Sequence, residues 1–238
     1  MENIEGFVRS AANALGVELF PAQTDAFQKY MKLLVSWNEK MNLTAITEPR
    51  DIVIKHFADS LTILSVLDVP DRAAVLDVGT GAGFPGVPLK IAKQGIELTL
   101  MDSQQKRLTF LKEVCEKIRI RADLVHARAE DAGHDKKMRM KFDLVTARAV
   151  APLPVLCEYC MPFVKKKGYF VAMKGPAAQD EIAQAQKAVK ELGCELQNAK
   201  ELSLMDGSKR TLIIFQRVTG IPAEYPRSAA KIKAKPLS

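Results

Sequence analysis

The apolar and polar positions of this chain fall into two zones with different periods. Up to about residue 70, apolar residues recur at three- and four-residue steps, which is typical of amphipathic helices. From Ala73 onward, short apolar runs alternate with helical patterns. That alternation predicts an α/β fold with a mostly parallel, doubly wound sheet and right-handed crossovers, preceded by a small helical N-terminal cap.

Three helices are expected in the first zone: one over Glu2–Leu15, a longer one opening at Pro21, and a third starting at Pro49. In the second zone we expect strands at 74–78, 97–102, 122–126, 142–147 and 168–173, with helices near 86–94, 104–118, 153–163 and 177–192. Two last strands, 195–204 and 210–218, predict a hairpin that closes the sheet. The expected division is a cap at 1–70, a sheet domain at 71–220 and a tail at 221–238.

A glycine-rich stretch follows the first strand, with Asp77 near its start and Gly79, Gly81, Gly83 and Gly86 in close succession. Glycines there let the backbone turn sharply and let a ligand come close. Strand, glycine turn and helix start together predict the nucleotide-facing corner of an α/β sheet.

Two cofactors suit this corner. Gly81, Gly83 and Gly86 fit the dinucleotide pattern, with Asp102 lying 21 residues beyond Gly81. Asp77 favours a cofactor with a methionine moiety over a dinucleotide, because its charge would repel a pyrophosphate and attract an ammonium group. The stretch resembles motif I of class I S-adenosylmethionine methyltransferases, and Asp102 resembles their ribose-binding acid.

Other strand ends also carry polar groups. Ala129 and Glu130 follow the third strand, although Glu130 could instead cap a helix. Arg148 ends an apolar strand, where a charge is costly unless it is paired or meets a ligand. In the cap, Asn42 and the pair His56 and Asp59 are polar candidates, for which local capping or a structural hydrogen bond is the alternative.

Composition narrows the class of protein. The 238 residues carry a net charge of +7, and the segment from Ser208 contributes seven basic residues against Glu224 alone. A basic end on a nearly neutral body favours a polyanionic partner such as nucleic acid, with a disordered solubilising end as the alternative. Cys157-x-x-Cys160 could indicate zinc or redox chemistry, but no second pair completes a zinc site, so buried cysteines are expected. No signal peptide or membrane-spanning run is evident, so a cytoplasmic protein is expected.

Several motifs then occur together in one order along nearly the whole chain: Asn42-Leu43-Thr44-Ala45-Ile46-Thr47, His56-Phe57-x-Asp59-Ser60, the glycine stretch through Gly86, Asp102-Ser103-x-x-Lys106-Arg107, Arg128-Ala129-Glu130, Ala147-Arg148-Ala149, Lys174-Gly175 and Tyr225-Pro226-Arg227. With them the chain resembles the RsmG (GidB) family, bacterial methyltransferases that act on N7 of a guanine in 16S ribosomal RNA. One departure is Ser228–Lys233, where the family often has a Gly-Thr-Pro-like stretch.

The resemblance implies a seven-stranded Rossmann-like methyltransferase sheet with an antiparallel edge over 71–220, S-adenosylmethionine as cofactor and the small ribosomal subunit as partner. It implies cofactor contacts at Gly79, Phe84, Ala129, Glu130 and Arg148, besides Asp77, Gly81, Gly83 and Asp102 from the glycine corner. Candidate RNA contacts are Asn42, His56, Lys174, Lys209, Arg210 and Arg227. Guanine N7 carries no proton, so neither a general base nor a metal is expected. The rival readings are a methyltransferase for another acceptor, an NAD-dependent oxidoreductase and a non-catalytic ribosome-assembly factor.

Overall fold

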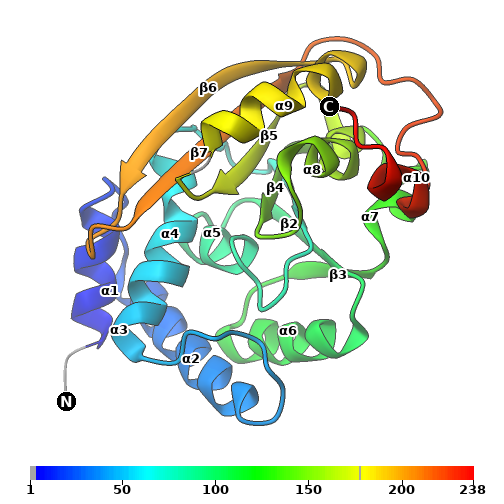
Figure 1. The fold of residues 1–238 in the computed structure, drawn as a ribbon. Coiled ribbons are helices and arrows are strands. Elements are labelled where there is room, and N and C mark those ends of the chain that lie inside the picture. Colours follow the sequence, from blue (N-terminus) through cyan, green and yellow to red (C-terminus); the bar gives the residue numbers. More distant parts are fainter. Residues whose placement is uncertain (1–3, 177) are drawn as a thin grey trace.

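The computed structural model describes residues 4–176 and 178–238, so the expected helix starts at Glu2 and at residue 177 lie outside the described residues. Its centre is a seven-stranded sheet in the order β3-β2-β1-β4-β5-β7-β6 (Figure 1). The strands are β1 Ala74–Val78, β2 Glu97–Asp102, β3 Ala122–His126, β4 Phe142–Arg148, β5 Val164–Lys174, β6 Cys194–Ser203 and β7 Lys209–Arg217.

The first five strands run parallel, and β7 pairs antiparallel with both β5 and β6. The predicted sheet and its closing hairpin are therefore confirmed. β5 starts four residues earlier than expected because it is extended across an irregular pairing with β4, where Lys167 has a φ of 66°.

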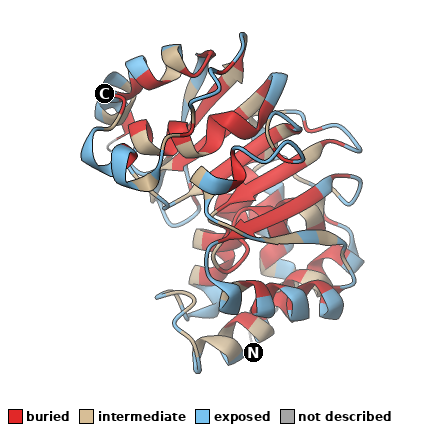
Figure 2. Ribbon diagram, turned by 90° about the vertical axis from the view of Figure 1, so that its right-hand side faces the viewer, coloured by how far each residue is buried: buried red, intermediate tan, exposed pale blue. Residues whose placement is uncertain are grey.

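Helices cover both faces of the sheet. One face carries α5 Gly86–Ala92 and α6 Gln105–Ile118, and the other carries α7 Ala129–Ala132, α8 Leu153–Cys160 and α9 Ala178–Glu191. Consecutive strand residues point to opposite faces, so Val75 enters the first core and Leu76 the second. Figure 2 shows the resulting band of buried strands between half-exposed helices.

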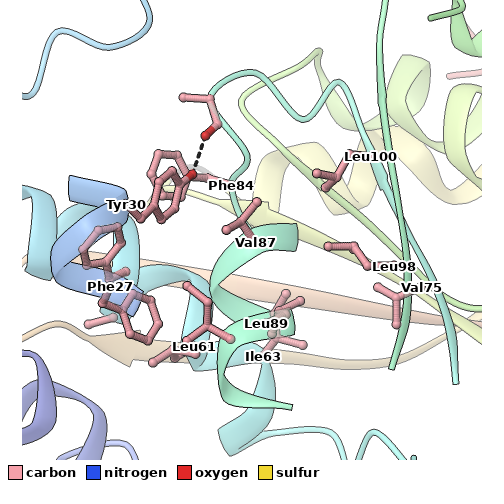
Figure 3. Close-up of a cluster of buried hydrophobic side chains, with 14 of the residues drawn as sticks. Phe27, Tyr30, Leu61, Ile63, Val75, Phe84, Val87, Leu89, Leu98 and Leu100 are labelled. Carbon is pink, nitrogen blue, oxygen red and sulfur yellow. Dashed lines mark hydrogen bonds between the residues drawn. The ribbon is translucent and has the colours of Figure 1, made fainter. Parts of the chain in front are cut away.

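The N-terminal cap joins the first of these cores. Its helices are α1 Ile4–Asn13, α2 Pro21–Asn38, α3 Pro49–Ile52 and α4 Asp59–Leu61. Phe27 and Tyr30 of α2 pack with Phe84 and Val87 beside the glycine loop, and the Tyr30 hydroxyl donates to the Ala82 carbonyl (Figure 3). The cap thus lies directly against the loop that follows β1.

The third expected helix of the cap is less regular than its apolar stripe predicts. A π-helical turn, η1 Val53–Ala58, separates α3 from α4, and a 3-10 turn, η2 Thr62–Ser65, follows. An apolar stripe does not reveal such a turn, because the wider turn changes the backbone bonding while the same face stays buried. Here His56 lies buried within η1, and Asp59, the first residue after η1, is also buried.

The end of the chain is folded, so the disordered alternative does not hold. After β7 it continues into α10 Ala229–Ala234, where Ile232 is buried, and Leu237 beyond it joins the second core. The exposed positions of this end include three lysines, Lys231, Lys233 and Lys235.

Candidate functional site

The loop after β1 has the backbone that its glycines predict. Gly79, Gly81 and Gly83 have φ values of 66°, 59° and 100°, in the left-handed region that favours glycine. At Gly79 a Cβ would lie 2.8 Å from Cγ2 of Val150, and at Gly83 it would lie 2.7 Å from the Tyr30 hydroxyl. Both positions therefore need glycine, for space as well as for conformation.

Asp77 lies beneath this loop and is fully buried. Its Oδ2 accepts from the Thr80 hydroxyl at 2.7 Å and from the Gly86 N–H at 2.9 Å, while Thr146 Oγ1 lies 3.3 Å from Oδ1. Burial raises its pKa to about 6, and the hydrogen bonds from Thr80 and Gly86 oppose that shift. The carboxylate thus holds the loop closed, and the predicted contact with an ammonium group stays a prediction.

Asp102 ends β2 and is 2% exposed. Its Oδ2 accepts from the Gly81 N–H at 2.9 Å and from Arg107 Nη1 at 3.2 Å, and its Oδ1 accepts from the Gln104 N–H at 2.8 Å. Asp102 therefore ties the end of β2 to the glycine loop of β1. A carboxylate at this place is positioned to accept hydrogen bonds from hydroxyl groups of a ligand.

A cavity of about 190 Å³ opens at the carboxyl ends of β1, β2 and β3. Four of the predicted cofactor residues line it: Gly79, Asp102, Ala129 and Glu130. Parallel strands present their ends at one edge, so residues far apart in sequence meet there. Asp77, Gly81, Gly83, Phe84 and Arg148 do not line this cavity.

Phe84 is buried among aromatic rings of the cap. Its ring stacks on His56, with centroids 4.4 Å apart, and on Tyr30 at 5.4 Å. The guanidinium of Arg148 lies 5.0 Å from the Phe84 centroid. These two predicted cofactor residues therefore face the cap in this structure, because Phe84 buries its ring and Arg148 finds an acid there.

Arg148, at the end of β4, is the centre of a hydrogen-bonded network with the cap. It donates to Asp59 Oδ2 at 2.8 Å, to the Lys55 carbonyl at 3.0 Å and to His56 Nδ1 at 3.0 Å. Arg210 Nε, from β7, lies 3.1 Å from the other Asp59 oxygen. The network therefore joins the cap to two strands of the sheet.

His56 is neutral in this network. Its Nδ1 accepts from Arg148, so Nε2 carries the proton and donates to Thr44 Oγ1 at 2.8 Å. Burial and the charge of Arg148 lower its pKa to about 3. Both ring nitrogens are occupied within the protein, which makes His56 a link between the cap loop and β4.

Comparison with known proteins identifies the family of this chain. The sequence profile of the GidB family, described as rRNA small subunit methyltransferase G, matches residues 23–212. The chain belongs to this family. It is 46% identical to the ribosomal RNA small subunit methyltransferase G of Desulforamulus reducens over 100% of both chains. It is 49% identical to the protein of the same name from Lactobacillus helveticus, over 90% of this chain and 91% of the relative.

Solved structures support the fold. An S-adenosylmethionine-dependent O-methyltransferase from Thermotoga maritima superposes with a TM-score of 0.52 at 16% identity, covering 79% of this chain and 72% of its own. TrmN from Thermus thermophilus gives a TM-score of 0.53 at 14% identity, over 70% of this chain and 53% of its own. At these identities the likeness concerns the Rossmann-like fold alone.

Besides His56, three of the candidate RNA residues have partners inside this GidB-family protein. Lys174 bonds Glu181 and the Ala151 carbonyl at 2.7 Å each, and Arg210 lies against Asp59. Arg227 bonds the fully buried Glu158 with its backbone and its guanidinium. Charged groups this close to the interior need partners, and these acids supply them.

The other candidates differ in exposure. Asn42 is exposed, and the hydrogen bonds of its loop come from Asn38, whose side chain bonds Leu43 and Thr44. Lys209 is exposed and donates to Ser203 Oγ at 2.7 Å. Local capping therefore falls to Asn38, while Asn42 and Lys209 are exposed at the surface.

Sequence reasoning missed two residues of the cavity wall, Val150 and Tyr159. Val150 follows Ala149, whose φ of 56° redirects the chain over Gly79. Tyr159 sits on α8 two residues after Cys157, in an expected helix where only the cysteines were considered. A helical period places Tyr159 off the apolar stripe, which was the one available signal.

Other features of the described residues bear on cofactor chemistry. Residues 4–176 and 178–238 contain no group of three or more His, Cys, Asp or Glu side chains placed to hold a metal ion. The four cysteines are buried and free, and burial raises the pKa of Cys157 and of Cys160. Within the same residues, none of the helices has the length and apolarity to cross a membrane.

Proposed function

We propose that this protein transfers a methyl group from S-adenosylmethionine to N7 of a guanine in the 16S ribosomal RNA of the small subunit. One observation carries the proposal: a chain of the rRNA small subunit methyltransferase G family has its cavity at the ends of β1, β2 and β3. The residues predicted for ribose and adenine, Asp102, Ala129 and Glu130, meet in that cavity.

The residues present fit the cofactor. Asp102 has a carboxylate at the cavity for the ribose hydroxyls, and Gly79 leaves room where a Cβ would collide with Val150. Ala129 and Glu130 form the wall next to Tyr159, where the adenine would lie. The cavity is smaller than the roughly 300 to 1,000 Å³ of ordinary ligand pockets, in keeping with a place for the adenosine end alone. When bound, the cofactor supplies an electrophilic methyl group.

The chain's own residues then have to position the target base, since guanine N7 has a lone pair and no proton to remove. His56 has no nitrogen available to act as a base, because its Nδ1 accepts from Arg148 and its Nε2–H donates to Thr44. Catalysis would come from holding the two reactants in line at short distance. The buried network around Arg148 would serve this by fixing the cap against the end of β4.

RNA selection would rest on shape and phosphate contacts. The exposed lysines of the tail, Lys231, Lys233 and Lys235, offer charge without internal side-chain partners among the described residues. Lys209 and Asn42 are further exposed candidates. A ribosomal RNA substrate would place the protein in the cytoplasm.

The test uses labelled S-adenosylmethionine with unmethylated 16S RNA, both naked and within small subunits. Borohydride and aniline convert N7-methylguanine into a strand break, so we expect one unique break that depends on Asp102. Label in the RNA without a strand break would support methyl transfer to RNA but would show that the acceptor is an atom other than guanine N7. Binding of RNA without any transferred label would favour an assembly factor instead.

An oxidoreductase is separated by ligand binding. S-adenosylhomocysteine should raise the melting temperature of the protein, because a ligand that binds only the folded state stabilises it. NAD should leave the melting temperature unchanged. The reverse result would contradict the proposed cofactor.

A further inference from the structure

The segment 221–237 crosses the same side of the sheet as α7 and α8 (Figure 1, orange-red to red). We call it the C-terminal strap. Ile221, Ile232 and Leu237 are buried in it, with exposed fractions of 8%, 0% and 5%. α10 packs against α8, and α7 packs against α8 as well. The strap is therefore part of the packed structure beside these two helices.

Arg139 and His134 hold the strap by its backbone. Arg139 donates to the carbonyls of Ile221, Pro222 and Tyr225 at 3.2, 3.0 and 2.6 Å, and also to the Gly133 carbonyl at 3.0 Å. The His134 Nε2–H donates to the Pro226 carbonyl at 2.7 Å. His134 lies two residues after α7, and Arg139 is bonded to the Gly133 carbonyl just beyond that helix, so both fix the strap relative to α7.

Packing at the end of α7 leaves no space for a side chain at Gly133. A Cβ on Gly133, the residue that ends α7, would lie 2.6 Å from Pro226 Cγ and 2.8 Å from its Cδ. The strap thus touches the backbone of the α7 terminus itself. Movement of Pro226 away from Gly133 would remove the support from one side of α7.

Arg227 makes the corresponding attachment to α8. Its backbone N–H and its Nε donate to Glu158 Oε1 at 2.8 and 2.9 Å, and its Nη2 donates to Oε2 at 2.7 Å. Glu158 is fully buried, so this bidentate pair is the compensation for its charge. A second attachment joins the Tyr225 hydroxyl to Glu191 Oε2 at the end of α9.

These two helices supply one wall of the cofactor cavity. Ala129 and Glu130 are the first residues of α7, and Tyr159 is the neighbour of Glu158 on α8. Burial raises the pKa of Tyr159, and the charges of Glu130 and Glu158 add to that rise. The strap therefore lies behind the wall that the adenine would contact.

We infer that Arg227 is a positioning residue for the cofactor: through Glu158 it holds α8 and α7 at the spacing that forms the adenine wall. The inference rests on the proposed function, since it concerns affinity for the same cofactor. It gives the strap a role in cofactor binding that is separate from any charge it offers to RNA.

The experiment measures the dissociation constant of S-adenosylhomocysteine by calorimetry, with no RNA present, at a temperature where every variant is folded by circular dichroism. The full-length variants are Arg227→Gln, Glu158→Gln and the double variant. The matched control is Lys233→Gln, which removes one exposed charge from the strap without touching an internal bond. Arg227→Lys tests rescue, because lysine keeps the charge and loses the bidentate geometry.

We expect Arg227→Gln to weaken binding about tenfold or more and Lys233→Gln to leave it within twofold. Arg227→Lys should fall between them, and the KM for S-adenosylmethionine should rise more than kcat falls. A variant that melts earlier yet binds with native affinity would overturn the inference, because the ion pair would then be structural only. If Arg227→Gln does not fold, Glu158→Gln decides by the same criterion, since it keeps the side-chain shape. Failure of the native protein to bind would instead overturn the proposed function.

Discussion

The buried, neutral His56 predicts a specific dependence of stability on pH. Its pKa is about 3 in the folded protein against 6.5 in the unfolded chain. Between these values the unfolded chain binds a proton that the folded protein does not, so the free energy of unfolding falls as pH falls below 6.5. Between about pH 7 and pH 5 the linkage relation gives a loss of about 2 kcal/mol from His56.

Asp77 acts in the opposite direction. Its pKa rises from 3.8 to about 6 on folding, so the folded protein takes up a proton first as pH falls. Over the same interval this contributes a gain of about 1 kcal/mol. The profile of the native protein alone is therefore a small difference of two effects, and a variant is needed to separate them.

The assay is urea unfolding at about pH 7, 6 and 5, followed by the fluorescence of Trp37, the single tryptophan of the sequence. The ring centroids of Trp37 and Phe110 lie 5.6 Å apart. His56→Gln lacks the titrating ring, so it should lose about 2 kcal/mol less than the native protein between the extremes. The control is His126→Gln, which makes the same substitution at an exposed histidine at the end of β3. Equal pH slopes for the native protein and His56→Gln would refute the reasoning.

Three further predictions concern the cofactor loop, the cap and the tail. Gly79→Ala should weaken S-adenosylhomocysteine binding about tenfold by calorimetry, since its Cβ meets Val150, and adding Val150→Ala should recover part; native affinity would contradict this. Arg148→Met should cost up to about 3 kcal/mol in urea unfolding because it leaves Asp59 buried beside Arg210 alone, and Asp59→Asn in that background should restore some of it. Failure of the second change to help would argue against the ion pair. Replacing the three exposed lysines Lys231, Lys233 and Lys235 with glutamine should lower the salt slope of 16S RNA binding by about 2 in a filter assay. An unchanged slope would show that the tail does not contribute to RNA binding.

The sheet was predictable because its strands are local apolar runs with clear ends. β1 and β2 begin and end at the predicted residues, 74–78 and 97–102, since both are followed by turn-forming residues. The antiparallel edge was predicted from the resemblance and the hairpin, whereas the strand order came only from the structure. The folded tail and the π turn at Val53–Ala58 were not predicted, because neither has a local pattern of its own.

Part of the candidate site was predictable for the same reason. Gly79, Asp102, Ala129 and Glu130 all follow strands, and parallel strands bring their ends together. Tyr159 enters the cavity from a helix on one face of the sheet, and its place off the apolar stripe does not say which cavity it lines. Its place depends on how α8 packs, which is a property of the whole second core.

The sequence by itself determined where the chain forms strands, helices and glycine turns, because these depend on residues within a few positions of one another. Only the tertiary structure decided which charged side chains face outward. Arg148, Arg210 and Arg227 look alike as candidates for a ligand, yet each meets an acid 69 to 151 residues away when the chain folds, Asp59 for the first two and Glu158 for the third. Burial makes an unpaired charge costly, so the fold selects those partners, whereas the lysines of the strap stay exposed to solvent.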